Sequence, residues 1–139
     1  MSFVLDSSAT LGWIYVDERT PAALELSERA VASEVWVPSI CHLEIANSLQ
    51  FSVIRGRIDA TFRDLSLADL KRLKIQVDNE THAFAWTSTL SFADRFRLTL
   101  HDACYLELAQ RRALPLATLD QDLRKAADVL GLANPAARR

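Results

Sequence analysis

Short apolar runs alternate along the chain with longer segments in which apolar residues recur every three or four positions. The short runs are typical of buried strands, and the longer segments are typical of helices packed on one side. The predicted strands cover residues 3–6, 34–38, 74–78 and 114–119. Strands that alternate with helices indicate an α/β fold with a mainly parallel sheet covered on both faces.

Capping residues mark the expected helices. Thr20, Ser39 and Asp59 are predicted N-caps, and Gly56 and Gly131 suit the left-handed conformation that ends many helices. The expected helices cover residues 7–15, 20–33, 39–56, 59–73, 80–97, 101–112 and 120–131. With only three glycines, four prolines and no evident linker, we expect one domain over residues 1–132 and a flexible C-terminal tail over residues 133–139.

The composition indicates the cellular compartment of the protein but does not identify its activity. A formal net charge of −2 looks wrong for a nucleic-acid binder, which is expected to be basic. Gathering four acids around a cation would nevertheless leave the remaining chain with more bases than acids, so a polyanionic substrate is not excluded. Cys41 and Cys104 lie in apolar helical segments, as buried thiols of a reducing compartment do. Without a recognisable signal peptide or membrane-spanning run, we expect a cytoplasmic protein.

Four acids fall where an open parallel sheet would gather them. Asp6 and Asp120 directly follow the first and fourth predicted strands, and Glu44 lies early in the helix after the second. Asp102 opens the helix that leads into the fourth strand. Residues after parallel strands share one sheet edge, where ligand sites form. Clustered carboxylates repel one another unless a cation joins them, and Mg²⁺ and Mn²⁺ prefer such oxygen ligands.

Each acid also has a purely structural interpretation. Asp6, Asp120 and Asp122 are good N-caps, and Asp102 follows Thr99 at the spacing of a capping box. Glu44 interrupts an apolar run, which is costly for a buried carboxylate unless it is paired or metal-bound, although a solvent-facing position is the alternative.

The chain resembles the PIN-domain nucleases, and among them the VapC-type toxins of bacterial type II toxin–antitoxin systems. The resemblance rests on "VLDSS", "VPSICHLEIANSL", "LTLHDACYLELAQRRALPLATLD" and the following "LRKAA". It covers nearly the whole chain in order, and the set of four motifs is more specific than any one of them.

The resemblance implies a three-layer α/β/α sandwich with a mainly parallel sheet of four to five strands. It also implies a Mg²⁺- or Mn²⁺-dependent endoribonuclease, a homodimer, and a cognate antitoxin that covers the active site. The family's final short strand is not recognisable in "GLANPAARR". The implied catalytic residues are Asp6, Glu44, Asp102 and Asp120, with Asp122 as an auxiliary metal ligand and the hydroxyls of Ser7 and Thr118 beside them.

Within this hypothesis three aspartates, Asp6, Asp102 and Asp120, hold one or two metal ions, and Glu44 positions the attacking water. His101 directly precedes Asp102. Because successive helical residues point about 100° apart, we expect the His101 side chain to point away from that of Asp102. Phosphates of an RNA substrate need basic contacts. The candidates are Arg95, Arg97, Arg124 and Lys125, with solvated helix surface as the alternative for all four.

Two other classes of function compete with the nuclease. The first is a PIN-like interaction module without significant catalysis, in which Trp13, Trp36 and Trp86 anchor a partner, although core packing is the better explanation for at least two of them. The second is a Mg²⁺-binding phosphoacceptor signalling domain with Asp78 as the acceptor. Such a domain needs a second acid after the first strand and a lysine after a late strand, and the sequence supplies neither.

Overall fold

The computed structural model describes residues 1–132, so the expected C-terminal tail lies outside the described residues. In chain order the elements are β1 (Ser2–Leu5), α1 (Ser7–Ile14), the short 3₁₀ helix η1 (Val16–Glu18), α2 (Pro21–Val31), β2 (Glu34–Pro38), α3 (Cys41–Ile54), α4 (Ala60–Leu70), β3 (Lys74–Asp78), α5 (Thr81–Phe84), α6 (Ser88–Phe96), α7 (Leu100–Arg112), β4 (Leu116–Ala117) and α8 (Gln121–Val129).

Within residues 1–132 the strands form one four-stranded sheet in the order β3-β2-β1-β4. Every pair is parallel, and the inner strand β1 places Val4 opposite Trp36 on β2 and Leu116 on β4. This arrangement confirms the predicted α/β fold. It also brings the ends of β1 and β4 side by side, although about 110 residues separate them in the sequence.

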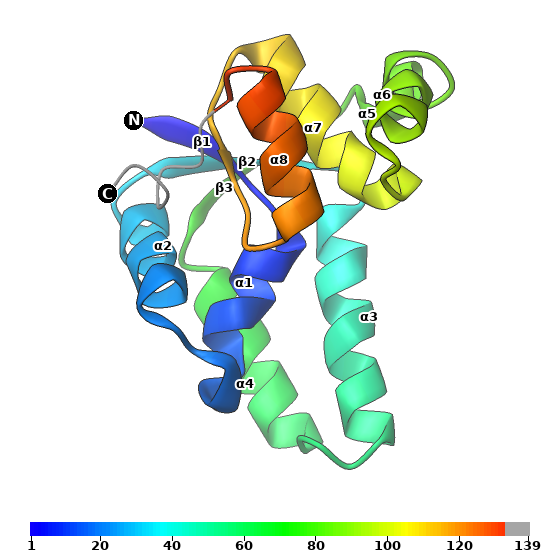
Figure 1. The fold of residues 1–139 in the computed structure, drawn as a ribbon. Helices are drawn as coiled ribbons and strands as arrows, with labels where there is room; N and C mark the ends of the chain where they lie inside the picture. The colour runs from blue at the N-terminus through cyan, green and yellow to red at the C-terminus, as the bar shows by residue number, and fades with distance from the viewer. Residues whose placement is uncertain (133–139) are drawn as a thin grey trace.

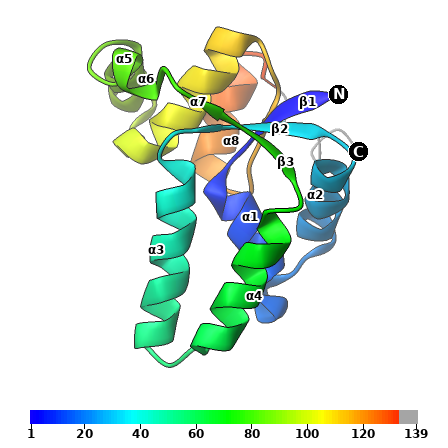
Figure 2. The same cartoon turned by 180° about the vertical axis from the view of Figure 1, so that it is seen from behind.

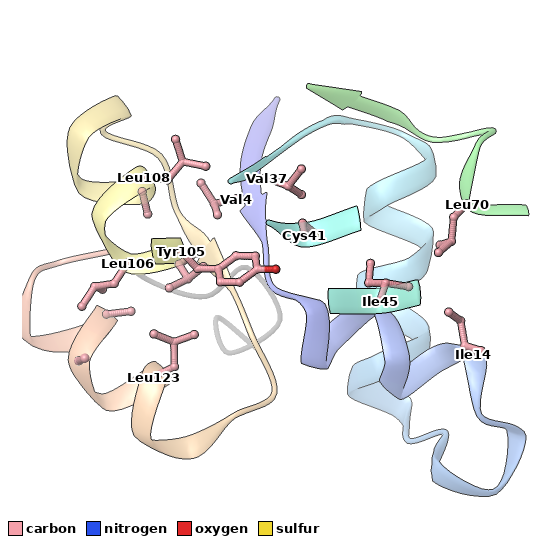
Figure 3. Close-up of a cluster of buried hydrophobic side chains, with 14 of the residues drawn as sticks. Val4, Ile14, Val37, Cys41, Ile45, Leu70, Tyr105, Leu106, Leu108 and Leu123 are labelled. Carbon is pink, nitrogen blue, oxygen red and sulfur yellow. The ribbon is translucent and has the colours of Figure 1, made fainter. Parts of the chain in front are cut away.

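Helices cover both faces of the sheet, as the alternation of elements predicts (Figures 1 and 2). On one face, Phe3 and Val35 pack against Leu26 and Ala30 of α2. On the other, Val4 and Leu116 belong to a larger cluster with the apolar side of α7 and with α8 (Figure 3). Alternate residues of β1 therefore face opposite helical layers, which confirms the three-layer arrangement.

Helices α3 and α4 form a hairpin that projects from the sheet (Figures 1 and 2). Gly56 turns the chain with a φ of +75°, and the Asp59 side chain caps α4 by accepting a hydrogen bond from the Phe62 amide at 2.8 Å. The end of α1 is tied to α3 by a hydrogen bond of 2.6 Å between the Tyr15 and Ser52 hydroxyls. The space between α1 and α3 is therefore held at a fixed width.

Three predicted boundaries are wrong. The expected helix over 80–97 is broken into α5 and α6, because Thr81 is anchored to the Ser39 amide while Thr87 leaves the helical region with a ψ of −96°. Ser39 does not cap α3, which begins at Cys41 with Ile40 in the N-cap position. The fourth strand shortens to Leu116–Ala117, since the next side chain turns toward the end of β1.

Trp13 and Trp36 pack against the core, which confirms the expectation for two of the three tryptophans, whereas Trp86 is 89% exposed. No helix in the described part of the chain combines the length and apolarity needed to cross a bilayer.

Candidate active site

Asp6 lies at the centre of the candidate site. It directly follows β1 and is only 1% exposed. Its Oδ2 atom accepts hydrogen bonds from the Ser8 hydroxyl and, at 2.7 Å, from the Thr118 hydroxyl. Its Oδ1 atom is buried without a hydrogen-bond partner in the described residues. A buried carboxylate oxygen left unpaired in this way is costly, so this position calls for a ligand.

Thr118 connects the two strand ends chemically. Its hydroxyl donates to Asp6 and accepts a hydrogen bond of 3.0 Å from the Asp120 backbone amide. Thr118 therefore lies where the sequence analysis places it. The hydroxyl of α1 that contacts Asp6 is that of Ser8, while Ser7 is half-buried beside it. The sequence reasoning missed Ser8. Nothing in "DSS" indicates which of the two serine hydroxyls contacts the Asp6 carboxylate.

The surroundings of Asp6 disfavour its charge. Burial raises its pKa to about 6, against the hydrogen bonds from Ser8 and Thr118, and the nearby charge of Asp102 raises it further. The pKa of Asp102 is itself raised, first by burial and then by the charge of Asp120, and Asp122 adds to the effect. Asp6, Asp102, Asp120 and Asp122 are thus linked electrostatically through Asp102.

The structural interpretation of these acids holds for part of the set. Asp120 caps α8, because its Oδ1 accepts from the Leu123 amide at 2.8 Å. Thr99 caps α7 by accepting a hydrogen bond of 3.2 Å from the Asp102 amide, and the Asp102 carboxylate also interacts with the Thr99 side chain. Asp6 occupies the N-cap position of α1, but its side chain makes no capping bond. Capping therefore explains Asp120 and Asp102 in part, and it does not explain the carboxylate of Asp6.

Glu44 in the first turn of α3 is half-buried and turned toward α7 rather than toward solvent. Its Oε1 accepts a hydrogen bond of 2.7 Å from the Tyr105 hydroxyl, and its Oε2 lies 4.0 Å from His101 Nδ1. Burial raises the pKa of the Cys41 thiol to about 12, and the charges of Glu44 and Asp6 both contribute. Glu44 therefore lies close to His101, and Cys41 lies within the electrostatic reach of both Glu44 and Asp6.

Tyr105 is a site residue that the sequence reasoning missed. It is fully buried in the core, and its ring reaches from α7 toward Cys41 at the start of α3 (Figure 3). Burial raises the pKa of its phenol, so the hydroxyl keeps its proton and donates to Glu44. The available signal was one hydroxyl inside the apolar stretch "ACYLELA", three positions after Asp102 and so close to the same helix face.

No three His, Cys, Asp or Glu side chains in residues 1–132 already converge closely enough to hold a metal ion directly. The donor set nevertheless fits a divalent cation. Asp6 Oδ1 is unpaired, and the neighbouring carboxylates raise one another's pKa values. A cation would remove both costs, and hard oxygen donors of this kind suit Mg²⁺ or Mn²⁺.

Of the four basic candidates, Arg124 comes closest to the site, because it donates to the Thr118 carbonyl at 3.4 Å. Arg95 lies over the ring of Phe96, with 4.7 Å between its guanidinium carbon and the ring centroid. Arg97 ends α6 in the left-handed region, and Lys125 is exposed on α8.

Asp78 does not fit the role of a phosphoacceptor. It is fully buried, and Arg111 donates hydrogen bonds to both of its carboxylate oxygens, at 2.6 Å to Oδ2 and 3.1 Å to Oδ1. Burial alone would raise the pKa of Asp78, but the hydrogen bonds and charge of Arg111 outweigh it and lower the pKa. Glu107 binds the same guanidinium, so Asp78 belongs to a buried ion-pair network.

Comparisons with known proteins agree with the fold. Residues 3–129 match the PIN domain family. The chain is 28% identical over 125 residues to Ribonuclease VapC3 from Pyrobaculum aerophilum, covering 88% of this chain and 92% of that protein. The crystal structure of PAE2754 from the same organism superposes with a TM-score of 0.67 and 17% identity, covering all of this chain and 97% of the other. The structural likeness supports the fold.

Proposed function

Since the chain belongs to the PIN-domain family, we propose that it is a metal-dependent endoribonuclease that hydrolyses RNA phosphodiester bonds at the site around Asp6. The observation that carries the proposal is the unpaired Oδ1 of the buried Asp6, within the electrostatic reach of Asp102. An unpaired carboxylate oxygen among other acids is a good cation ligand and a poor structural feature. The relative named as a ribonuclease supports RNA as the substrate class.

The proposed roles are those that the family resemblance implies. Asp6, Asp102 and Asp120 hold Mg²⁺ or Mn²⁺, with Asp122 as an auxiliary ligand. Bound metal of this kind activates water and neutralises charge on phosphoryl oxygens. Ser8 and Thr118 fix the Asp6 carboxylate by donating to Oδ2, which leaves Oδ1 as the oxygen that would bind the ion.

Glu44 orients the attacking water in this proposal. Its carboxylate is held by the Tyr105 hydroxyl, which fixes one oxygen and leaves the other 4.0 Å from His101 Nδ1. Arg124, which donates to the Thr118 carbonyl, would contact a substrate phosphate. Arg95, Arg97 and Lys125 would serve as more peripheral phosphate contacts.

We further propose that the ribonuclease is the toxin of a toxin–antitoxin pair. The similarity to a VapC protein over most of both chains supports this role. The implied partners are a cognate antitoxin that covers the acidic site and a second copy of the chain, in the cytoplasm. Co-purification with the product of the adjacent gene tests the first of these.

The experiment is a cleavage assay on single-stranded RNA with purified protein. Wild type is expected to cleave with Mg²⁺ or Mn²⁺ and to stop in EDTA. Asp6→Asn and Asp102→Asn should each lower the rate at least about a hundredfold, in the range that one strong electrostatic contact contributes. Asp128→Asn is the matched control, because Asp128 is an exposed acid on α8 that takes no part in the site.

Two results would contradict the proposal. Cleavage by Asp6→Asn at the rate of wild type would remove the carboxylate site. Absence of cleavage by wild type with either metal, on RNA from cells that the protein arrests, would favour an interaction module instead. Sequencing RNA 5′ ends after induced expression would identify the target of an active protein.

A further inference from the structure

A groove of about 470 Å³ runs between α1 and α3, beginning beside the candidate site. Ser8, whose hydroxyl binds Asp6, lines one end of it. Arg55 and Arg57, at the turn between α3 and α4, line the other end. The hydrogen bond between Tyr15 and Ser52 holds the two walls together. The groove is thus a fixed channel that continues outward from the acids.

One face of α3 forms the wall of this groove. Ser48, Phe51, Ser52 and Arg55 all line it, at spacings of three and four residues. The same spacing carried one step back reaches Glu44, at the candidate site. At 1.5 Å per residue the distance from Glu44 to Arg55 along the helix is about 16 Å. This face of α3 therefore extends from Glu44, a proposed catalytic acid, to the positive charge of Arg55, over the length of a few nucleotides.

The two arginines at the far end differ in their partners. Arg57 is neutralised by Asp17 at 3.0 Å and Glu18 at 2.6 Å. Arg55 makes no ion pair with any carboxylate of the described residues. Its guanidinium carbon instead lies 5.7 Å from the centroid of the Phe51 ring, which is 49% exposed. The groove thus carries an exposed cation beside an exposed aromatic ring.

We propose that this groove binds the single-stranded RNA flanking the cleaved bond, with Arg55 contacting a phosphate and Phe51 stacking on a base. The proposal rests on the ribonuclease function proposed above. Proteins bind single strands by combining a cationic groove with aromatic side chains on which bases stack. Serine hydroxyls along the wall are further donors to phosphate or ribose oxygens.

The test measures binding of a short fluorescent single-stranded oligoribonucleotide of mixed sequence, in EDTA so that the RNA stays intact. Arg55→Ala should weaken binding several-fold and reduce the slope of log affinity against log salt by about 0.7, the amount of one lost phosphate contact on a single strand. Phe51→Ala should weaken binding about fivefold or more, since stacking contributes at least about 1 kcal/mol per base. Arg55→Lys should retain most of the affinity because it keeps the charge.

Arg72→Ala is the matched control, because Arg72 is an exposed arginine at the end of α4, outside the groove. Circular dichroism checks that each variant is folded. If Arg55→Ala binds RNA as tightly as wild type and with the same salt slope while wild type cleaves RNA, the groove serves another occupant, such as a partner protein, and this proposal is overturned. If wild type binds RNA and shows the Arg55 effect but never cleaves, the ribonuclease function fails while the groove assignment stands.

Discussion

Asp6 is held in surroundings that destabilise its charged form. A carboxyl group prefers water, but this one follows the inner strand β1 and is buried with one oxygen unpaired. Hydrogen bonds from Ser8 and Thr118 only partly offset burial and the charge of Asp102, so the pKa rises from 3.8 to about 6. In the absence of metal, the folded protein thus binds a proton at Asp6 more tightly than the unfolded chain does.

Because folding raises the pKa of Asp6, the effect of Asp6→Asn on stability should depend on pH. Without metal, the stability contributed by Asp6 is greatest below pH 4 and falls as pH rises from 3.8 to about 6. At pH 7.5 the neutral variant should be more stable than wild type by up to about 3 kcal/mol, from roughly two pKa units at 1.36 kcal/mol each. Urea unfolding in EDTA at pH 7.5 and pH 4 measures this, and the gain should vanish at pH 4.

Asp128→Asn serves as the control for amide substitution, and it should change stability little at either pH. An Asp6→Asn variant that is less stable than wild type at pH 7.5 would mean that the charged Asp6 is well solvated or well paired, against the buried geometry described above.

At the scale of elements, α7 connects the site to the edge of the sheet. Its first turn carries Asp102, and Tyr105 one turn later holds Glu44 of α3. Near its other end, Arg111 binds Glu107 on the same helix and Asp78 at the end of β3. The helix therefore fixes the distance between the active-site acids and the outer strand through buried charge pairs.

We expect Arg111→Leu to destabilise the fold by about 3 kcal/mol at pH 7, because Asp78 and Glu107 would be left as buried carboxylates. The expected loss lies at the lower end of the free-energy range for broken buried ion pairs, because Arg112 lies 3.7 Å from Asp78 and still offsets part of its charge. Without Arg111 the pKa of the buried Asp78 rises, so the loss should shrink as pH falls and Asp78 takes up a proton. Urea unfolding at pH 7 and pH 5 measures the difference.

Arg72→Leu is the comparison for the loss of one arginine charge, because that side chain is 84% exposed and its contact with Asp69 is 4.0 Å long. A loss for Arg111→Leu that is no larger than the loss for Arg72→Leu would show that the network contributes little.

At the scale of the whole molecule, the proposed metal ligands come from separate parts of the chain. Asp6 follows β1, Asp102 begins α7 and Asp120 begins α8. An ion bound to all three exists only in the folded state, so metal binding should stabilise the entire fold.

Mn²⁺ at about a hundred times its Kd should add roughly 2.7 kcal/mol, which for a chain of this size corresponds to a rise in Tm of about 5–10 °C. Thermal unfolding with and without Mn²⁺ at pH 7.5 tests this. Asp102→Asn should lose most of the rise, and Asp128→Asn should keep it. An equal rise in all three proteins would indicate binding elsewhere.

Sequence pattern alone determined the alternation of strands and helices, the position of Asp6 at the end of β1, and the caps at Thr20, Asp59, Thr99 and Asp120. These follow from local preferences and from the fixed direction of strands in a parallel sheet, so a pattern of residue types is sufficient to specify them. The coupling of Asp6 with Asp102 follows from the same topology.

The tertiary structure alone decided which partners each acid acquires. Tyr105 meets Glu44 across 61 positions and Thr118 meets Asp6 across 112, and no local preference encodes such pairs. The choice of Ser8 over Ser7, the pairing of Asp78 with Arg111 and the break at Thr87 likewise depend on what packs nearby. Side-chain orientation and desolvation are set by the surrounding fold, so the raised pKa of Asp6 and its unpaired oxygen arise only once the chain has folded.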